Sequence, residues 1–299
     1  MEEELLDEKT SNFMETENEP KKKIRWWHKL LIGFVLIIIS IFVYSRYIET
    51  KLIQIEEKQI VKTTLPSSFN GLKIVHFSDI HYGLTVNEKE LKQIVEDINE
   101  LNADIIFFTG DLFTSSINYI DQTIAFLKEQ FANIKCTQKK YAVIGDQDMH
   151  MFHKYKEILE GSNFILLENE NDIFFYKDVS PIMIAGVESQ AYNPKLSDAL
   201  TSEEPVSLKI LLSHEPSIVN QIEDDQLELI FAGHSLGGQI KIPGVKPIIS
   251  KDYVSDYYTG QFDVNNTSLF VTNGLGTEKY PFRFGARPTI NLYRIYNYY

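Results

Sequence analysis

Cysteine is almost absent from this sequence, since Cys136 is the only one among 299 residues. A single thiol excludes an internal disulfide framework, and it excludes any zinc site built from cysteines. It leaves the cellular compartment open. Internal repeats and low-complexity tracts are also missing. With 43% hydrophobic residues the chain can bury one sizeable core, and we expect a single folded domain.

Positive charge is also scarce, with 29 Lys and Arg residues against 42 Asp and Glu residues and a net charge of −13. The first twenty residues hold eight acids and one lysine, so −7 of this charge lies in that tail. The rest of the chain is only mildly acidic, which argues against nucleic-acid binding through a basic face. The tail has few large apolar side chains, and we expect it to be disordered.

One long uncharged run follows the tail, over residues 30–45. It is slightly short for a full membrane span, but Lys29 and Arg46 at its ends can extend their charges to the interface. Aromatic residues suited to the interface flank it: Trp26, Trp27, Tyr44 and Tyr47. We interpret residues 30–48 as one transmembrane helix. The alternatives are a buried core helix and a cleaved signal peptide, although no A-x-A-like cleavage site follows.

The basic residues around the run predict its orientation. Five lie in the ten positions before it, and two lie in the ten positions after it. By the positive-inside rule, the N-terminus is cytoplasmic and the C-terminal part lies on the outer side of the cell membrane. The expected layout is a cytoplasmic tail at 1–29, a single-pass helix at 30–48, a charged stalk at 49–59 and a folded domain at 60–299.

Strand-like and helix-like patterns alternate in the first half of the domain. Strands are expected at Lys73–Ser78, Asp104–Thr109 and Lys140–Gly145, and helices at 87–101, at 119–134 and from about Met149. Asn87 and Glu90 fit a capping box at the start of the first of these helices. Such alternation predicts an α/β sheet with helices packed outside it.

The second half is richer in strands. Three segments, at Phe164–Leu167, Ile173–Tyr176 and Ile182–Ala185, follow one another with only turns between them, which suggests an antiparallel portion. Further strands are expected at Leu208–Ser213, Leu227–Ala232, Leu269–Thr272 and Thr289–Ile295, with a helix at 216–222.

Polar residues stand just past five of the predicted strands: Asp79 and His81, Asp111, Asp146, His214, and His234. Catalytic groups of open α/β sheets gather outside the carboxyl ends of strands, so we expect these exits to meet in one crevice. A lone Asp is more often a turn former, and a lone His is more often structural, which is the interpretation kept for His76, His150 and His153. Five coincident exits are harder to explain in this way.

Three carboxylates in one crevice repel one another unless cations neutralise them, and bound divalent metal ions are the natural remedy. Mixed Asp and His ligands suit Mn, Fe or Zn better than Ca, which prefers oxygen throughout. The sequence therefore predicts a metal centre at the strand exits.

The exits carry motifs that together resemble a known family. They are Asp79-x-His81, Gly110-Asp111, Gly145-Asp146-Gln147-Asp148, Ser213-His214-Glu215-Pro216 and Gly233-His234-Ser235-Leu236-Gly237-Gly238-Gln239. In order and spacing this set resembles the calcineurin-like metallophosphoesterase superfamily, and most of all its bacterial membrane-anchored branch, over residues 60–296. The resemblance implies a four-layer α/β/β/α sandwich, here preceded by the transmembrane helix, and a two-metal site that hydrolyses phosphate esters.

The resemblance also assigns roles. It places Asp79 and His81 on a first metal, Asp111 between both metals, and Asp146, His214 and His234 on a second. The implied cofactors are two divalent metal ions, which can be Mn, Fe, Zn or Mg. Gln147 and Asp148 stand at the catalytic positions, with a supporting role expected for Asp148. The implied partner is a phosphorylated small molecule or lipid, with a mono- or diester or a diphosphate as the reacting bond.

Three residues depart from the family pattern. Asp146 replaces an asparagine and remains a competent ligand, and Leu236 replaces a histidine of the first metal, which leaves that metal oxygen-rich and favours Mn or Mg over Zn. Gln147 replaces the histidine that assists the leaving group. Glutamine cannot deliver a proton, and the loss of a general acid typically costs roughly 10²–10⁴ in rate. A leaving group of low pKa, such as a diphosphate or nucleotide, suffers least.

Three function classes follow from these residues. The first is a membrane-anchored phosphoesterase, supported by the six remaining ligand positions. The second is a degenerate member that binds metal or a phosphorylated ligand without turnover, suggested by Gln147 and Leu236. The third is a membrane-tethered scaffold without metal. Either Arg283 or Arg287, in the motif PFRFGARP, could contact a substrate phosphate, although an exposed arginine without a special role is the commoner case.

Overall fold

The computed structural model describes residues 25–63, 65–177, 180–223, 226–242, 244–247, 249 and 251–297. It separates into two units, Met1–Phe42 and Val43–Tyr299. The expected disorder of the acidic tail concerns residues that lie outside this described part.

Helix α2, Trp26–Val43, belongs to the first unit except for its last residue, and none of its residues is buried. The helical path continues into the second unit through a π-helical turn at Tyr44–Ile48 and a 3₁₀ turn at Glu49–Lys51. Over Trp26–Lys51 the mean hydropathy reaches 2.2, so this helix is long and apolar enough to cross a membrane. A signal sequence near the N-terminus meets the same criterion.

Two six-stranded sheets form the second unit. The first has the order β1-β12-β2-β3-β4-β5, with strands at Gln54–Val61, Thr289–Tyr296, Lys73–Phe77, Ile105–Phe108, Lys139–Ala142 and Phe164–Leu166. The second has the order β10-β11-β9-β8-β7-β6, with strands at Gly260–Val264, Thr267–Val271, Leu229–Ala232, Lys209–Ser213, Ile182–Gly186 and Glu170–Phe174. Strands β2 to β5 are parallel, and so are β7, β8, β9 and β11. Their carboxyl ends therefore share one edge in each sheet.

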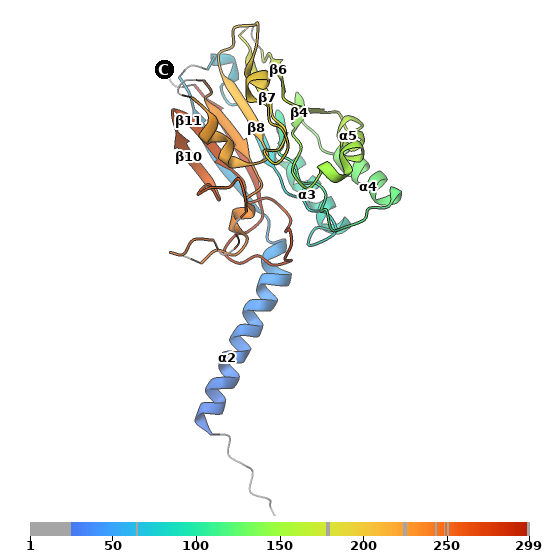
Figure 1. Cartoon of the computed structure of the whole chain (residues 1–299), viewed down its shortest axis with the longest axis vertical. Coiled ribbons are helices and arrows are strands. Elements are labelled where there is room, and N and C mark those ends of the chain that lie inside the picture. Colours follow the sequence, from blue (N-terminus) through green and yellow to red (C-terminus); the bar gives the residue numbers. More distant parts are fainter. Residues whose placement is uncertain are drawn as a thin grey trace, which may run out of the picture. The chain divides into compact units, whose positions relative to one another are not determined.

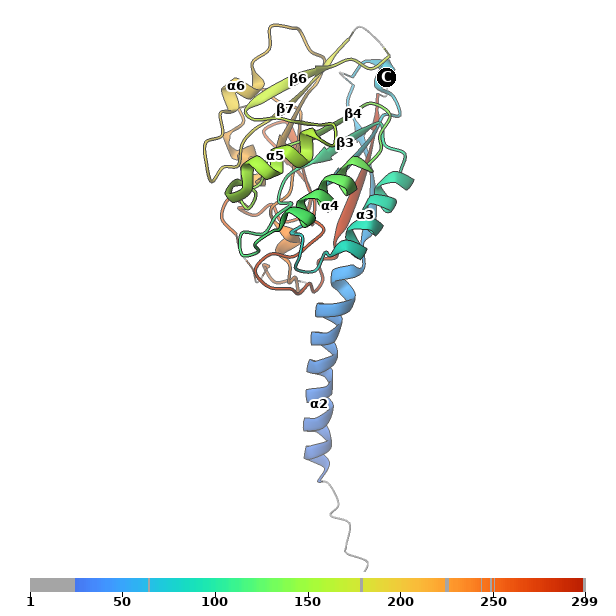
Figure 2. The same ribbon diagram turned by 90° about the vertical axis from the view of Figure 1, so that its right-hand side faces the viewer.

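Helices cover the outer face of each sheet. In the first layer α4, Asp121–Ala132, packs between α3, Glu88–Glu100, and α5, Phe152–Glu160, and Figure 2 shows these three helices lying over β3 and β4. The second sheet carries α6, Leu196–Leu200, and a 3₁₀ helix at Pro216–Gln221 (Figure 1). Shorter 3₁₀ turns occur at Ser67–Phe69, Met149–Met151 and Leu236–Gly238. The predicted α/β/β/α sandwich is confirmed.

The central strands are apolar without interruption because both of their faces are covered. In β3, Ile-Ile-Phe-Phe, all four residues are buried. Phe108 packs into the core beneath the helices, whereas its neighbour Phe107 packs between the two sheets against Phe231. A third core lies on the outer face of the second sheet, around Ile218 and Ile230.

Some local predictions are confirmed and others are wrong. Asn87 and Glu90 form the expected capping box of α3, and β6 pairs antiparallel with β7. Strand β5 instead extends the parallel first sheet next to β4. The segment predicted as a helix at 216–222 is a 3₁₀ helix. The expected stalk at 49–59 is not separate from the sheet, since β1 pairs in parallel with β12. Its sequence is rich in charge because β1 is an edge strand.

Candidate metal centre

The six residues predicted as ligands come from the facing ends of both sheets. Asp79 and His81 follow β2, Asp111 follows β3 and Asp146 follows β4, whereas His214 directly follows β8 and His234 follows β9. Backbone hydrogen bonds continue past the strand ends, for example from Asp79 N to Gly110 O at 2.9 Å and from Gly233 N to His214 O at 2.9 Å. The strand framework therefore holds both sets of loops in place.

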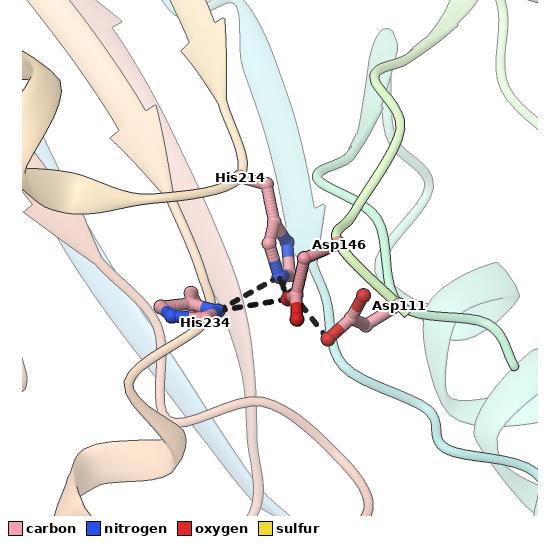
Figure 3. Close-up of side chains that lie close together, drawn as sticks. All are labelled: Asp111, Asp146, His214 and His234. Atoms are coloured by element: carbon pink, nitrogen blue, oxygen red, sulfur yellow. Dashed lines mark hydrogen bonds and ion pairs between the residues drawn. The ribbon is translucent and has the colours of Figure 1, made fainter. Parts of the chain in front are cut away.

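Asp111, Asp146, His214 and His234 form one cluster, in which one ligand atom from each residue lies within 4.8 Å of the others. Figure 3 shows the two carboxylates facing the two imidazoles across the gap between the sheets. Nε2 of His214 lies 3.1 Å from Asp111 Oδ2 and 3.3 Å from Asp146 Oδ1. Nδ1 of His234 lies 3.2 Å from the same Asp146 oxygen.

Asp79, His81 and Asp111 form a second cluster within the same limit. Nε2 of His81 lies 3.5 Å from Asp111 Oδ2 and 3.9 Å from Asp79 Oδ1. All three side chains are fully buried. Asp111 belongs to both clusters, so the two candidate sites share one carboxylate. The structure thus brings all six predicted ligands together.

Each of the three imidazoles is oriented by a backbone carbonyl. Nδ1 of His81 faces Phe113 O at 3.2 Å, and Nδ1 of His214 faces Thr109 O at 2.6 Å. Nε2 of His234 faces Asp252 O at 2.9 Å. Since a carbonyl only accepts, each of these nitrogens carries a proton, and the other ring nitrogen faces the cluster. Metal-binding histidines are commonly held in this way.

Several buried atoms at the centre lack a hydrogen-bond partner among the described residues. They are His81 Nε2, Asp111 Oδ2 and Asp146 Oδ1. A buried polar atom without a hydrogen-bond partner lowers the stability of the fold. These three atoms can each donate a lone pair to a metal ion, and they belong to the two clusters. The donor set of carboxylate oxygens and imidazole nitrogens fits Mn, Fe or Zn in the cluster that holds His214. The residues present therefore fit divalent metal ions.

The charges at the centre shift several pKa values. Burial, with the field of Asp146, raises the pKa of Asp111 well above its usual value. Burial opposes the charging of His214, but Asp111 and Asp146 outweigh it and raise its pKa. By contrast, burial lowers the pKa of His81 to about 4 and also lowers that of His234. Without a metal ion, protons held by Asp111 and His214 thus offset part of the negative charge of the centre.

Several candidate ligands that follow the strands have a left-handed backbone conformation. Asp79, His81, Asp111 and His234 all have positive φ values, between 44° and 65°. For residues other than glycine this conformation costs free energy, and such residues gather at functional sites. Gly233 permits the close approach of the two sheets, because a Cβ there would lie 2.1 Å from Ser78 Oγ and 2.5 Å from Asp79 Oδ2.

Gln147 contacts a candidate metal ligand through its side chain, whereas Asp148 binds backbone N–H groups. The amide of Gln147 donates to Asp146 Oδ2 at 2.7 Å and accepts from Ser115 Oγ at 2.6 Å, which leaves Oδ1 of Asp146 free for the cluster. The buried carboxylate of Asp148 accepts from the backbone N–H groups of Asp111, Phe113 and Gly145. Asp148 therefore fixes the loops after β3 and β4, and burial raises its pKa to about 7.

Neither Arg283 nor Arg287 lies where it could contact a phosphate at the candidate ligands. Arg283 is fully buried, and its guanidinium donates to the carbonyls of Gly276, Leu236, Ala286, Asn273 and Gly274. All of its donors are used, so Arg283 ties loops together and has none left for a phosphate. Arg287 is exposed and lines a separate cavity of about 720 Å³ that contains none of the six ligand candidates.

The histidines assigned a structural role lie outside both clusters. His76 is buried between the sheets against Phe231 and Tyr293, and its Nε2 contacts Thr109 Oγ1 at 2.9 Å. Burial lowers the pKa of His76 to about 3. His150 and His153 are exposed.

Sequence reasoning missed a lysine beside the centre. Lys251 and Glu278 form an ion pair at 2.7 Å, and both line a cavity of about 350 Å³ together with Asp146 and His234. Burial opposes the charge of Lys251, but Glu278 and the three aspartates of the centre raise its pKa. The two residues are 27 positions apart in loops, and no motif connects them in the sequence.

Comparison with known proteins finds relatives that are named as metallophosphoesterases. The sequence profile of the calcineurin-like phosphoesterase family matches residues 72–238. The uncharacterized metallophosphoesterase YkuE of Bacillus subtilis is 30% identical over 257 residues, which cover 84% of this chain and 88% of the relative. YkoQ of the same organism is 24% identical over 89% of this chain and 99% of its own length. A "transmembrane protein with metallophosphoesterase domain" from Danio rerio is 26% identical over 79% of this chain, and the match spans 56% of that protein.

Proposed function

The chain belongs to the calcineurin-like phosphoesterase family, as its motifs predict, and on that premise we propose that it is a membrane-anchored, metal-dependent phosphoesterase. The family acts on phosphorylated substrates. The observation that carries the proposal is the pair of ligand clusters that share Asp111, with every imidazole held by a carbonyl so that its free nitrogen faces the cluster.

Each of the two clusters would bind one metal ion. Asp79, His81 and Asp111 would hold one divalent ion, and Asp111 with Asp146, His214 and His234 would hold the other. Metal ions bound there supply Lewis acidity, which activates water and stabilises negative charge on phosphoryl oxygens. The first cluster, with two carboxylates and one imidazole, favours Mn or Mg, whereas the second also suits Fe or Zn.

The residues around the metals limit the substrate. Gln147 is the nearest side chain in sequence to Asp146, and its amide is engaged with Asp146 and Ser115. It has no proton to give a leaving group. The reaction is therefore expected to be efficient with leaving groups that depart as anions, such as an aryl oxide or a phosphate, and slow with simple alkyl phosphates.

Membrane anchoring is the second part of the proposal. The helix over Trp26–Lys51 is apolar enough to span a bilayer, and a relative is named as a transmembrane protein. The excess of basic residues before the helix supports a cytoplasmic N-terminus, with residues 49–299 on the outer side.

The test uses the full chain purified in detergent with added Mn²⁺. We expect hydrolysis of an activated aryl phosphate or of a diphosphodiester, and loss of that activity in Asp111→Asn, which keeps the shape of the side chain but removes the shared charge. Absence of turnover above the Asp111→Asn background, across Mn, Fe, Zn and Mg and both substrates, would contradict the enzymatic proposal.

A second candidate function is a binding protein without turnover, and the observation that favours it is that Gln147 and Leu236 stand where the family pattern has histidines. The double variant Gln147→His/Leu236→His separates the two functions. A large gain of activity from an inactive parent supports the binding protein. A modest change from an already active parent supports the enzyme.

A further inference from the structure

The feature that the metal centre leaves unexplained is the buried ammonium group of Lys251. The side chain of Lys251 is 12% exposed, and its partner Glu278 is 24% exposed. Both line the cavity that also reaches Asp146 and His234. An ammonium group is strongly hydrated and rarely buried unless it is paired.

The ion pair does not satisfy the ammonium group. Nζ of Lys251 lies 2.7 Å from Glu278 Oε2 and has no further hydrogen-bond partner among the described residues, so donors of the three that an ammonium group carries stay unused. A buried donor in this state is costly. An acceptor that enters the cavity would relieve it, and the cavity is the space next to the candidate metal ligands.

Lys251 also lies beside the candidate metal ligands. Its side chain lines the same cavity as Asp146 and His234, two of the four residues of the cluster around His214. The ammonium group is therefore placed to act on a ligand bound beside that cluster.

Positive charge from other side chains is scarce in this cavity. Gln147 is neutral and is engaged with Asp146 and Ser115. Arg283 is fully buried with its guanidinium on backbone carbonyls. Lys279 lines the same cavity but is exposed at its rim. Among the positively charged side chains that the structure describes in this cavity, Lys251 is the one that is buried, has unused N–H donors and lies beside the candidate metal ligands.

We propose that Lys251, held in place by Glu278, binds a phosphoryl oxygen of the substrate beside the metal centre. This inference rests on the proposed function and adds a substrate-binding residue to it. Glu278 acts as a positioning residue, because it keeps the ammonium group in the cavity. The ligand recognised is a phosphate dianion or a phosphate ester. A charge-assisted hydrogen bond to such an oxygen is short and strong.

A rival role for Lys251 is to neutralise the aspartates in place of a metal ion. The two roles predict different measurements. If Lys251 replaces a cation, its removal increases the number of metal ions bound. If Lys251 binds phosphate, its removal leaves the number of metal ions unchanged and weakens the binding of inorganic phosphate.

The test compares Lys251→Met and Lys251→Arg with wild type, using the full chain in detergent, saturated with Mn²⁺. Inorganic phosphate is titrated by calorimetry, and bound manganese is counted by elemental analysis. We expect Lys251→Met to weaken phosphate binding by about 10- to 100-fold and Lys251→Arg to keep most of the affinity. The matched control is Lys246→Met, since Lys246 is exposed and paired with Asp256 away from the cavity, and it should bind phosphate like wild type.

Unchanged phosphate affinity in Lys251→Met, or an increase in its bound manganese, overturns the inference. If Lys251→Met does not fold, Lys251→Gln keeps polar donors without the charge and is expected to show the same loss of affinity. An active wild type with an unaffected Lys251 variant would contradict this inference alone. Phosphate binding that depends on Lys251 in a protein without turnover would support it while contradicting the enzymatic proposal. Absence of phosphate binding by wild type contradicts the inference, whatever the activity.

Discussion

Nε2 of His214 lies 3.1 Å from Oδ2 of Asp111, although the two residues come from different sheets. Nδ1 of His214 faces the carbonyl of Thr109 at 2.6 Å and so carries a proton. In the singly protonated imidazole Nε2 is then an acceptor, and it faces another acceptor. A cation between them, either a proton or a metal ion, is needed to make this contact favourable. This contact between loops of the two sheets therefore depends on what occupies the metal centre.

The first prediction concerns metal removal. Because ligands for one centre come from both sheets, metal binding should stabilise the fold by mass action. A metal ion at about 100 times its Kd contributes about 2.7 kcal/mol. We expect EDTA to lower the Tm measured by differential scanning fluorimetry, and Mn²⁺ or Zn²⁺ to restore it. In His214→Ala the response to metal should be much smaller. Equal responses in the two proteins would contradict metal binding at this place.

The second prediction concerns pH. The pKa values of Asp111 and His214 are both raised, so the metal-free protein retains protons there to higher pH than usual. A metal ion needs the deprotonated ligands and must displace these protons. The apparent metal affinity should therefore rise as the pH rises through the raised pKa values and fall as the centre is acidified.

Calorimetric titration of Mn²⁺ in buffers with different ionisation enthalpies measures the protons released. We expect net release near neutral pH, and less release in Asp111→Asn. Proton uptake on metal binding, or an affinity that does not change with pH, would show that these groups are not the ligands.

The sequence predicts which candidate ligands come together because the position of each depends on local signals. A buried strand that ends in Gly-Asp or Gly-His fixes both the direction of the chain and the residue at its exit, as at Asp111 and His234. Strand β1 was missed for the opposite reason. It is an edge strand with alternating exposed residues, and its partner β12 lies more than 200 residues away. Nothing local distinguishes such a segment from a charged stalk.

The roles of Arg283 and Lys251 could not be predicted because they depend on tertiary burial. A loop arginine is usually exposed, but Arg283 is enclosed by carbonyls from several loops. Lys251 becomes notable only because the fold places it in the cavity with Glu278, Asp146 and His234. Both cases depend on contacts between segments that are far apart in the sequence.

The third prediction concerns Gly233, which lies between the two sheets. A methyl group there would lie 2.1 Å from Ser78 Oγ and 2.5 Å from Asp79 Oδ2, so Gly233→Ala must push the loop after β9 away from β2. We expect a loss of about 1–3 kcal/mol in the free energy of unfolding, together with weaker metal binding, because His234 and Asp79 move apart. Metal titration and thermal unfolding measure the two effects. Gly33→Ala is the control, since no atom lies within 4 Å of a Cβ there.

The fourth prediction concerns the buried guanidinium of Arg283. Its removal in Arg283→Met leaves several buried carbonyls without a donor, including that of Gly276 at 2.6 Å. Each such group costs about 1–3 kcal/mol, so we expect a total loss of at least about 3 kcal/mol in stability. Arg287→Met removes an exposed arginine four positions away and should change stability by no more than about 0.5 kcal/mol. Similar denaturation midpoints for the two variants would contradict the role assigned to Arg283.

The last prediction tests the orientation in the membrane. Burial raises the pKa of the Cys136 thiol, and Cys136→Ser leaves a chain without cysteine. Two reporters can then be added separately: Glu96→Cys, at an exposed position of α3, and Ser11→Cys, in the acidic tail. In intact cells a membrane-impermeant maleimide should label the protein at position 96 if the domain lies on the outer side, as the proposed orientation requires. Position 11 should be labelled only after the cells are permeabilised. The reverse pattern would contradict the positive-inside assignment. A mature protein that has lost residues 1–45, identified by its intact mass, would instead support a cleaved signal peptide.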